Sequence, residues 1–212
     1  MKIRSWLPAL GLVLAVTACG SSGSGADQSS SAPTSPVTAS PSVKGVESLG
    51  AASSTASTPA ASGPAVASPD GDFTVVLPTG WRQDTAVAQQ IKAVAAYFGP
   101  TRNAFASNVN VVREDLPAGL DVESYRAKSL AGLRAAIAIT DLTPSTKLSV
   151  DGEDALEYSF TDTQQGRKLI QRQTVVLHGS SAYTITYTST TVDFAASSAA
   201  AHSIVGSLRW RS

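Results

Sequence analysis

Hydrophobic and polar residues alternate along several short segments in the second half of the chain. The most regular segment is residues 182–189, where aromatic and aliphatic side chains at 183, 185 and 187 alternate with threonines. A period of two predicts a strand with one face on the core of an antiparallel sheet. Further strands are expected over residues 72–77, 108–114, 146–150, 155–160, 167–178 and 207–210. Asp151-Gly152 and Gly179-Ser180 are expected to form hairpin turns, because Asp-Gly accommodates positive φ at both central positions.

Three other segments have the spacing or composition of helices. After Asp84, apolar residues recur at helical spacing until Gly99-Pro100 ends the run; they are Val87, Ile91, Val94 and Phe98. Asp121 is expected to cap a second helix with an apolar stripe that runs to Ile137. A closing helix is expected from about Val192 to Gly206. Together these elements predict an α+β fold, an antiparallel β-sheet packed by helices.

The aromatic residues divide the chain into a folded part and an unfolded part. Apart from Trp6, every Phe, Tyr and Trp lies between Phe73 and Trp210, so we expect a single globular domain over residues 70–212. Residues 19–69 consist almost entirely of Ser, Ala, Thr, Pro and Gly and cannot bury enough apolar surface to offset the entropy of ordering. This segment is therefore expected to be a disordered tether with a typical reach of roughly 40 Å.

The first eighteen residues have the organisation of a signal peptide. Lys2 and Arg4 precede an apolar run that ends in Val16-Thr17-Ala18-Cys19, and this run is too short to span a bilayer. Small residues directly before a cysteine resemble the lipobox of bacterial lipoproteins. We therefore expect cleavage between Ala18 and Cys19, followed by S-diacylglycerol and N-acyl (palmitate) attachment at Cys19. The mature protein would then be a lipid-anchored membrane protein on the extracytoplasmic face of the cell membrane.

The charge balance argues against nucleic acid as a partner. Without Lys2 and Arg4, the 16 Lys and Arg residues fall to 14 against 16 Asp and Glu, a net charge of about −2. The densest basic groups are Arg167-Lys168 with Arg172, and Arg209 with Arg211. We interpret both groups as solvated strand faces.

Several core and turn positions are similar to those of a known family. These are Phe73 with Leu77-Pro78-x-Gly80-Trp81, the strand Asn108-Val109-Asn110-Val111-Val112, and Tyr183-x-Ile185-x-Tyr187 leading through Phe194 to Ile204-x-x-Ser207-Leu208. The pattern resembles the actinobacterial LpqN-type lipoproteins, which have a PsbP-like α/β/α sandwich domain. The resemblance implies an envelope-associated, generally non-catalytic protein, and it supplies no set of functional residues.

Candidate chemistry in the folded part is sparse. His178 and His202 have no partner at metal-ligand spacing, and Cys19 is the only cysteine, so neither a metal, a cofactor nor a catalytic residue is predicted. No Gly-x-Ser-x-Gly nucleophile elbow occurs after residue 70. Trp81, Tyr97 and Phe98 are the candidate residues for a binding face, with core packing as the alternative for each.

Three functions remain open from the sequence. The leading hypothesis is a non-catalytic accessory or binding protein of the cell envelope, anchored in the membrane and with an envelope protein or lipid as partner. The second is a carrier of a small apolar or lipid ligand. The third is a hydrolase with an unrecognised site, which requires His178 or His202 beside a carboxylate and a serine.

Overall fold

The computed structural model describes residues 63–211. The expected signal peptide, the Ala18 and Cys19 processing site and most of the expected tether therefore lie outside the described residues. The helices within 63–211 are all too short or too polar to cross a membrane.

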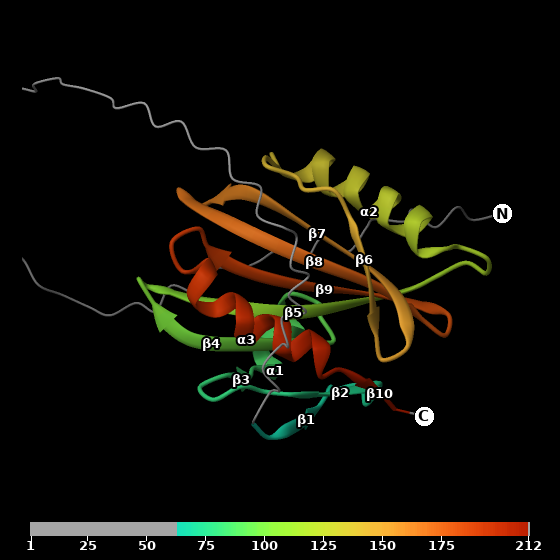
Figure 1. Cartoon of the computed structure of the whole chain (residues 1–212), viewed down its shortest axis with the longest axis horizontal. Coiled ribbons are helices and arrows are strands. Elements are labelled where there is room, and N and C mark those ends of the chain that lie inside the picture. The colour runs from blue at the N-terminus through green and yellow to red at the C-terminus, as the bar shows by residue number, and fades with distance from the viewer. Residues whose placement is uncertain (1–62, 212) are drawn as a thin grey trace, which may run out of the picture. The chain divides into compact units, whose positions relative to one another are not determined.

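The centre of the fold is a seven-stranded antiparallel sheet with the strand order β3-β4-β5-β9-β8-β7-β6 (Figure 1). Its strands are β3 (Arg82–Gln83), β4 (Ala95–Arg102), β5 (Phe105–Asp115), β6 (Thr146–Val150), β7 (Glu153–Gln164), β8 (Arg167–His178) and β9 (Ser181–Thr190). The predicted turn at Asp151-Gly152 is confirmed, with φ of 49° and 89° at its two residues. The predicted α+β class with an antiparallel sheet is confirmed.

A second, three-stranded sheet in the order β1-β2-β10 adds to the fold. It consists of β1 (Ala65–Ala67), β2 (Phe73–Val76) and β10 (Arg209–Trp210). The expected domain boundary at residue 70 is therefore wrong, because β1 pairs with β2 over Ala65–Ala67. Only three residues form this strand, too few for an alternation of apolar and polar residues to be detected in the sequence.

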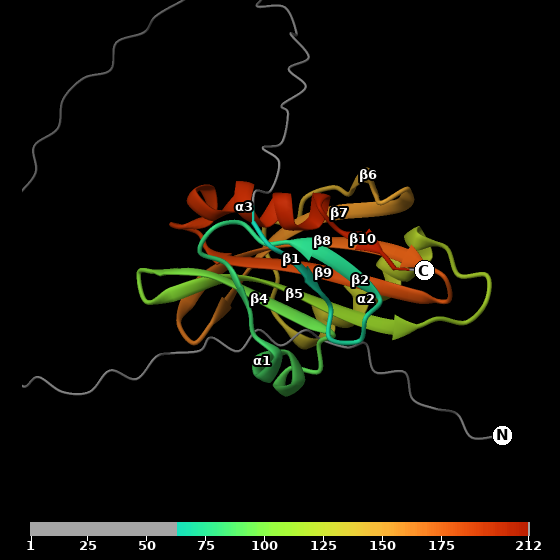
Figure 2. The same ribbon diagram turned by 90° about the horizontal axis from the view of Figure 1, so that it is seen from below.

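Helices lie on both faces of the large sheet. They are α1 (Thr85–Gln90), α2 (Val122–Ala136) and α3 (Phe194–Gly206). Figure 2 shows α3 on one side of the sheet and α1 on the other, and α2 packs with Tyr158 and Phe160 on the same face as α1. The predicted cap of α2 is confirmed, because the Asp121 carboxylate accepts a hydrogen bond of 2.7 Å from the backbone N–H of Ser124.

The expected first helix is confirmed at its start, but its second half is wrong. Helix α1 begins after Asp84 as predicted but ends at Gln90, and Lys92 has a φ of 58°. Residues from Ala95 onward form β4, which pairs with β5. Gly99-Pro100 ends no helix and instead lies at a register shift between Phe98 and Thr101, where proline's missing N–H is tolerated.

A polar cluster connects β2 to the large sheet at Asp72. The Asp72 carboxylate accepts hydrogen bonds of 2.7 Å from the Tyr183 hydroxyl and from Arg113. The Tyr183 hydrogen bond and the positive charge of Arg113 lower the pKa of Asp72 below 3.8, even though desolvation opposes them. Since the folded-state pKa is lowered, the ionised Asp72 stabilises the fold at pH above 3.8. This contribution is lost as the pH falls below 3.8 and passes the lower pKa of the folded state.

We expect Asp72→Asn to lower the free energy of unfolding by about 1–2 kcal/mol at pH 7, because a charge-assisted pair of hydrogen bonds is weakened at a partly exposed site. The difference between Asp72→Asn and the unmodified protein should shrink towards zero near pH 2, as measured by urea unfolding at both pH values. Asp115→Asn is the matched control, because Asp115 also contacts Arg113 but its side chain is 82% exposed. An equal effect at both pH values would contradict the electrostatic origin.

Candidate functional site

The three aromatic residues proposed as a binding face are core residues. Tyr97 is 0% exposed, Phe98 8% and Trp81 9%. Tyr97 and Trp81 belong to the core beneath α3, whereas Phe98 packs under α1 on the opposite face. Burial raises the pKa of the Tyr97 hydroxyl. The proposed binding face is therefore wrong, because alternate residues of β4 enter two different cores.

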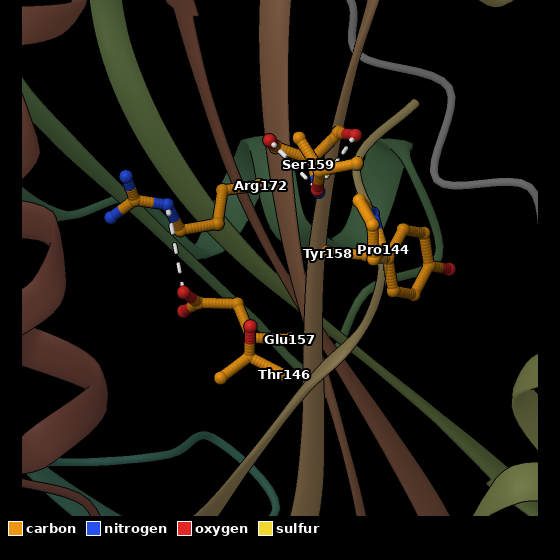
Figure 3. Close-up of a pocket in the computed structure, with 7 residues that line it drawn as sticks. Pro144, Thr146, Glu157, Tyr158, Ser159 and Arg172 are labelled. Carbon is orange, nitrogen blue, oxygen red and sulfur yellow. Dashed lines mark hydrogen bonds and ion pairs between the residues drawn. The ribbon is translucent and has the colours of Figure 1, made fainter. Parts of the chain in front are cut away.

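The structure instead has a polar pocket of about 450 Å³ on the face of the sheet that carries α3. It is lined by Thr143, Pro144, Thr146, Glu157, Tyr158, Ser159 and Arg172. Glu157 and Ser159 are two residues apart on β7 and so point to the same face, and Arg172 lies opposite Ser159 on β8. Figure 3 shows Arg172 and Glu157 directed towards one another, with the Tyr158 ring turned away from them.

One wall of the pocket is the connection that precedes β6. The backbone N–H of Thr143 donates to the Ser159 carbonyl at 2.9 Å, and the Thr143 hydroxyl accepts from the Ser159 N–H, also at 2.9 Å. The Thr143 hydroxyl thus accepts the Ser159 N–H in place of a main-chain carbonyl, at the residue just before Pro144. This pairing fixes Thr143 and Ser159 beside each other, and their hydroxyl oxygens are 3.3 Å apart.

Arg172 and Glu157 provide the charges of the pocket. Arg172 Nε lies 3.8 Å from Glu157 Oε1, and the Thr174 hydroxyl donates to Glu157 Oε2 at 3.3 Å. The Arg172 guanidinium also lies over the Phe194 ring at the start of α3, 5.1 Å from its centroid. Within residues 63–211, neither terminal nitrogen of Arg172 makes a hydrogen bond. The terminal nitrogens of the guanidinium can therefore bind two oxygens of a carboxylate or phosphate group in a bidentate manner.

The serine and the histidines named as candidates for hydrolysis are not brought together within residues 63–211. In residues 63–211 the hydroxyl of Ser159 bonds to Thr143 and not to a histidine. His178 Nδ1 lies 3.0 Å from Glu153 Oε1, but its ring stacks on Trp210 and no described serine hydroxyl bonds to it. No group of three or more His, Cys, Asp or Glu side chains in the described part of the chain is arranged to hold a metal ion.

Sequence reasoning missed this pocket. The sequence predicts Arg172 to be part of a solvated face, yet it is half-buried between Glu157 and Phe194. The alternation of Glu157 and Ser159 on β7 is visible in the sequence, but their pairing with β8 depends on strand register. The role of Thr143 could not be inferred, because residues 137–145 have no periodic pattern.

Solved structures of low sequence identity share this fold. LpqN of Mycobacterium tuberculosis, described as involved in cell envelope biogenesis, is 14% identical with a TM-score of 0.52, and the match covers 68% of this chain and 88% of LpqN. Cyanobacterial PsbP from Synechocystis sp. PCC 6803 is 10% identical with a TM-score of 0.50, covering 70% of this chain and 92% of its own. PA94 from Pseudomonas aeruginosa, described as a protein of unknown function and putative regulator, is 16% identical with a TM-score of 0.50. The match covers 66% of this chain and 92% of PA94.

These likenesses define the folded part as a PsbP-like α+β domain, and at such identities they show the fold alone. A family model then gives the relationship: the chain belongs to the DcrB family, whose model matches residues 72–207. No curated protein matches the chain. The resemblance to LpqN-type proteins is thus confirmed at the level of the fold.

Proposed function

We propose that this protein is a non-catalytic accessory lipoprotein, anchored on the extracytoplasmic face of the cell membrane, that binds an envelope component through the pocket of Glu157 and Arg172. The observation that carries the binding role is the half-buried Arg172 guanidinium, which lines a pocket of about 450 Å³ and whose two terminal nitrogens make no hydrogen bond within residues 63–211. The envelope component would present an anionic oxygen to Arg172 and a hydrogen-bond donor to Glu157.

The sequence motif at Cys19 supports the location. A positive start, an apolar run and small residues before the only cysteine form the signal of a bacterial lipoprotein. The fold neighbour LpqN is described as involved in cell envelope biogenesis, which is consistent with this location.

A second candidate, the lipid carrier, has less support from the site. The pocket presents hydroxyl groups, a carboxylate and a guanidinium, and an apolar ligand would leave these polar groups without partners. The apolar side chains beneath α2 and α3 are packed against one another as core clusters. We therefore favour a polar partner over an acyl chain.

Photo-crosslinking in intact cells tests the proposed binding role. A photoreactive residue in place of the exposed Thr146, on the rim of the pocket, should capture a reproducible partner. Arg172→Ala should reduce the yield of this crosslink at least about tenfold, because a central arginine often dominates binding. Arg172→Lys should give an intermediate yield, since lysine keeps the charge but loses the planar fork.

The exposed Arg134 of α2 provides the matched control, because Arg134→Ala removes a positive charge at a distance from the pocket lining. Its crosslink yield should equal that of the unmodified protein. If Arg172→Ala and Glu157→Gln both leave the crosslink unchanged, the pocket is not the binding site. If no partner is recovered at all, the accessory role itself is contradicted.

A further inference from the structure

The pocket of Glu157 and Arg172 combines one negative and one positive side chain. These two are the only charged residues among its seven lining residues, so the charges of the lining cancel. Both side chains are largely shielded from water, with Arg172 26% exposed and Glu157 24% exposed. A ligand in this pocket therefore meets two opposite charges side by side, which Figure 3 shows directed towards one another.

The two charged groups leave each other room for further partners. Arg172 Nε lies 3.8 Å from Glu157 Oε1, which exceeds the length of about 2.7–3.2 Å that is typical of a hydrogen bond. The Thr174 hydroxyl donates to Oε2 of Glu157 only. Within residues 63–211, Glu157 Oε1 accepts no hydrogen bond and the terminal nitrogens of Arg172 donate none. The carboxylate can therefore accept from a ligand while the guanidinium donates to it.

We infer that the ligand of this pocket is an α-amino acid zwitterion, with its carboxylate on Arg172 and its ammonium group on Glu157. This inference rests on the proposed function, in which the same pocket binds an envelope component. An α-amino acid carries both charges on one carbon atom, so they are close neighbours, as are Arg172 and Glu157. Two carboxylate oxygens match the planar fork of the guanidinium, and the ammonium group supplies three donors.

A ligand with a single charge fits the same pocket less well. An anion on Arg172 would lie close to the Glu157 carboxylate, and a cation on Glu157 would lie close to the guanidinium. Like charges a few ångströms apart repel strongly where water is partly excluded. A zwitterion avoids this repulsion, because it replaces one long contact between Glu157 and Arg172 by two charge-assisted pairs.

The other walls of the pocket suit the remainder of an amino acid. The hydroxyl oxygens of Thr143 and Ser159 lie 3.3 Å apart, and Thr146 is exposed at the rim. Hydroxyl groups can donate or accept, so they favour a small or polar side chain over a long apolar one. The volume of about 450 Å³ is in the range of small-molecule sites. A free amino acid and an amino acid group that ends a larger envelope molecule present the same chemistry here.

Isothermal titration calorimetry of residues 19–212 with Cys19→Ser gives the first test. The probes are the D- and L-forms of alanine, serine and lysine, and at least one of them should bind with a Kd of about 1 mM or lower. Nα-acetylation and carboxyl amidation of that probe should each weaken binding at least about tenfold, because each leaves one charge of the pocket unpaired. Phosphoethanolamine, whose charges are further apart, should also bind at least about tenfold more weakly.

Variants of the two charged residues give the second test. Glu157→Gln should weaken binding of the amino acid at least about tenfold, yet it should strengthen binding of the Nα-acetyl derivative, because the repelling carboxylate is gone. Arg172→Ala should weaken binding of both compounds. Loss of folding would not produce opposite changes for the two compounds, and Arg134→Ala on the exposed surface of α2 should change neither.

A peptide attached through the ε-nitrogen of lysine distinguishes the two sources, because it leaves the α-amino acid group of that lysine free. Binding as tight as that of free lysine assigns the site to the end of a larger envelope molecule, whereas binding of free amino acids alone assigns it to these.

Three results would overturn the inference: no probe binds, the Nα-acetyl derivative binds as tightly as its parent, or phosphoethanolamine binds more tightly than every amino acid. The proposed function is judged separately by the crosslink from position 146. A crosslink that depends on Arg172, without binding of any amino acid, would contradict the zwitterion and leave the proposed function standing.

Discussion

Replacing Tyr97 by alanine is expected to lower the free energy of unfolding by about 3–5 kcal/mol, the range found when a large buried aromatic side chain is removed. Tyr97 is 0% exposed and belongs to the core beneath α3. Its removal would leave a cavity between β4 and that core, which a strand paired on both sides cannot close by collapsing. Urea unfolding followed by fluorescence measures the effect.

Tyr97→Phe separates the ring from the hydroxyl. The Tyr97 hydroxyl is buried without a hydrogen-bond partner in residues 63–211, so its removal should leave stability unchanged or raise it by up to about 1 kcal/mol. Val192→Ala is the control for a surface change, because Val192 is 80% exposed and should shift stability by less than about 0.5 kcal/mol. If the Tyr97→Ala protein is as stable as the Val192→Ala protein, Tyr97 does not contribute to the core and the prediction is wrong.

The strands of the second half of the chain could be predicted because local sequence and tertiary structure agree there. Tyr183, Ile185 and Tyr187 alternate with threonines, and the structure places those three side chains together in the core beneath α3. Asp-Gly at residues 151–152 needs no tertiary information, since its preference for positive φ is local. The same is true of Asp121, whose side chain caps α2 from one residue away.

The segment after α1 could not be predicted because two periodicities coincide. Val87, Ile91, Val94 and Phe98 fit a helix, but residues 95–98 are apolar at every position and are buried on both faces of the sheet. A short continuous apolar run is compatible with a buried strand or a buried helix. Pairing with β5 decides between them, and that partner lies beyond a turn at Asn103 and Ala104.

The polar residues of β5, β7, β8 and β9 could not be placed from the sequence because their surroundings depend on strand register. The threonines of β9 predict a solvated face, but register places Thr186 and Thr188 between asparagines and glutamines that are themselves buried. Arg172 and Glu157 likewise meet across β7 and β8, on residues that nothing in the local sequence connects. The proposed binding pocket therefore depends on polar side chains whose partial burial follows from strand pairing.

Cys19→Ser is expected to move the protein from the membrane fraction to the soluble fraction almost completely. A single acyl chain binds a bilayer only marginally, whereas two or three chains give stable anchoring, since each buried methylene contributes about 0.8 kcal/mol. The apolar run before Cys19 is about half the roughly 20 residues that a membrane span needs, so a retained leader would not replace the lipid as a permanent anchor. Fractionation of cells and intact mass of both forms provide the measurement.

Ser21→Ala is the matched control for Cys19→Ser, because it changes a neighbouring small residue and leaves the only cysteine in place. This variant should remain in the membrane fraction, with a mass that includes the acyl chains. A Cys19→Ser protein that has lost its leader and is still bound to the membrane would refute lipid anchoring. The folded domain would then have to bind the membrane itself, and Arg172→Ala in the Cys19→Ser background would show whether the pocket does so.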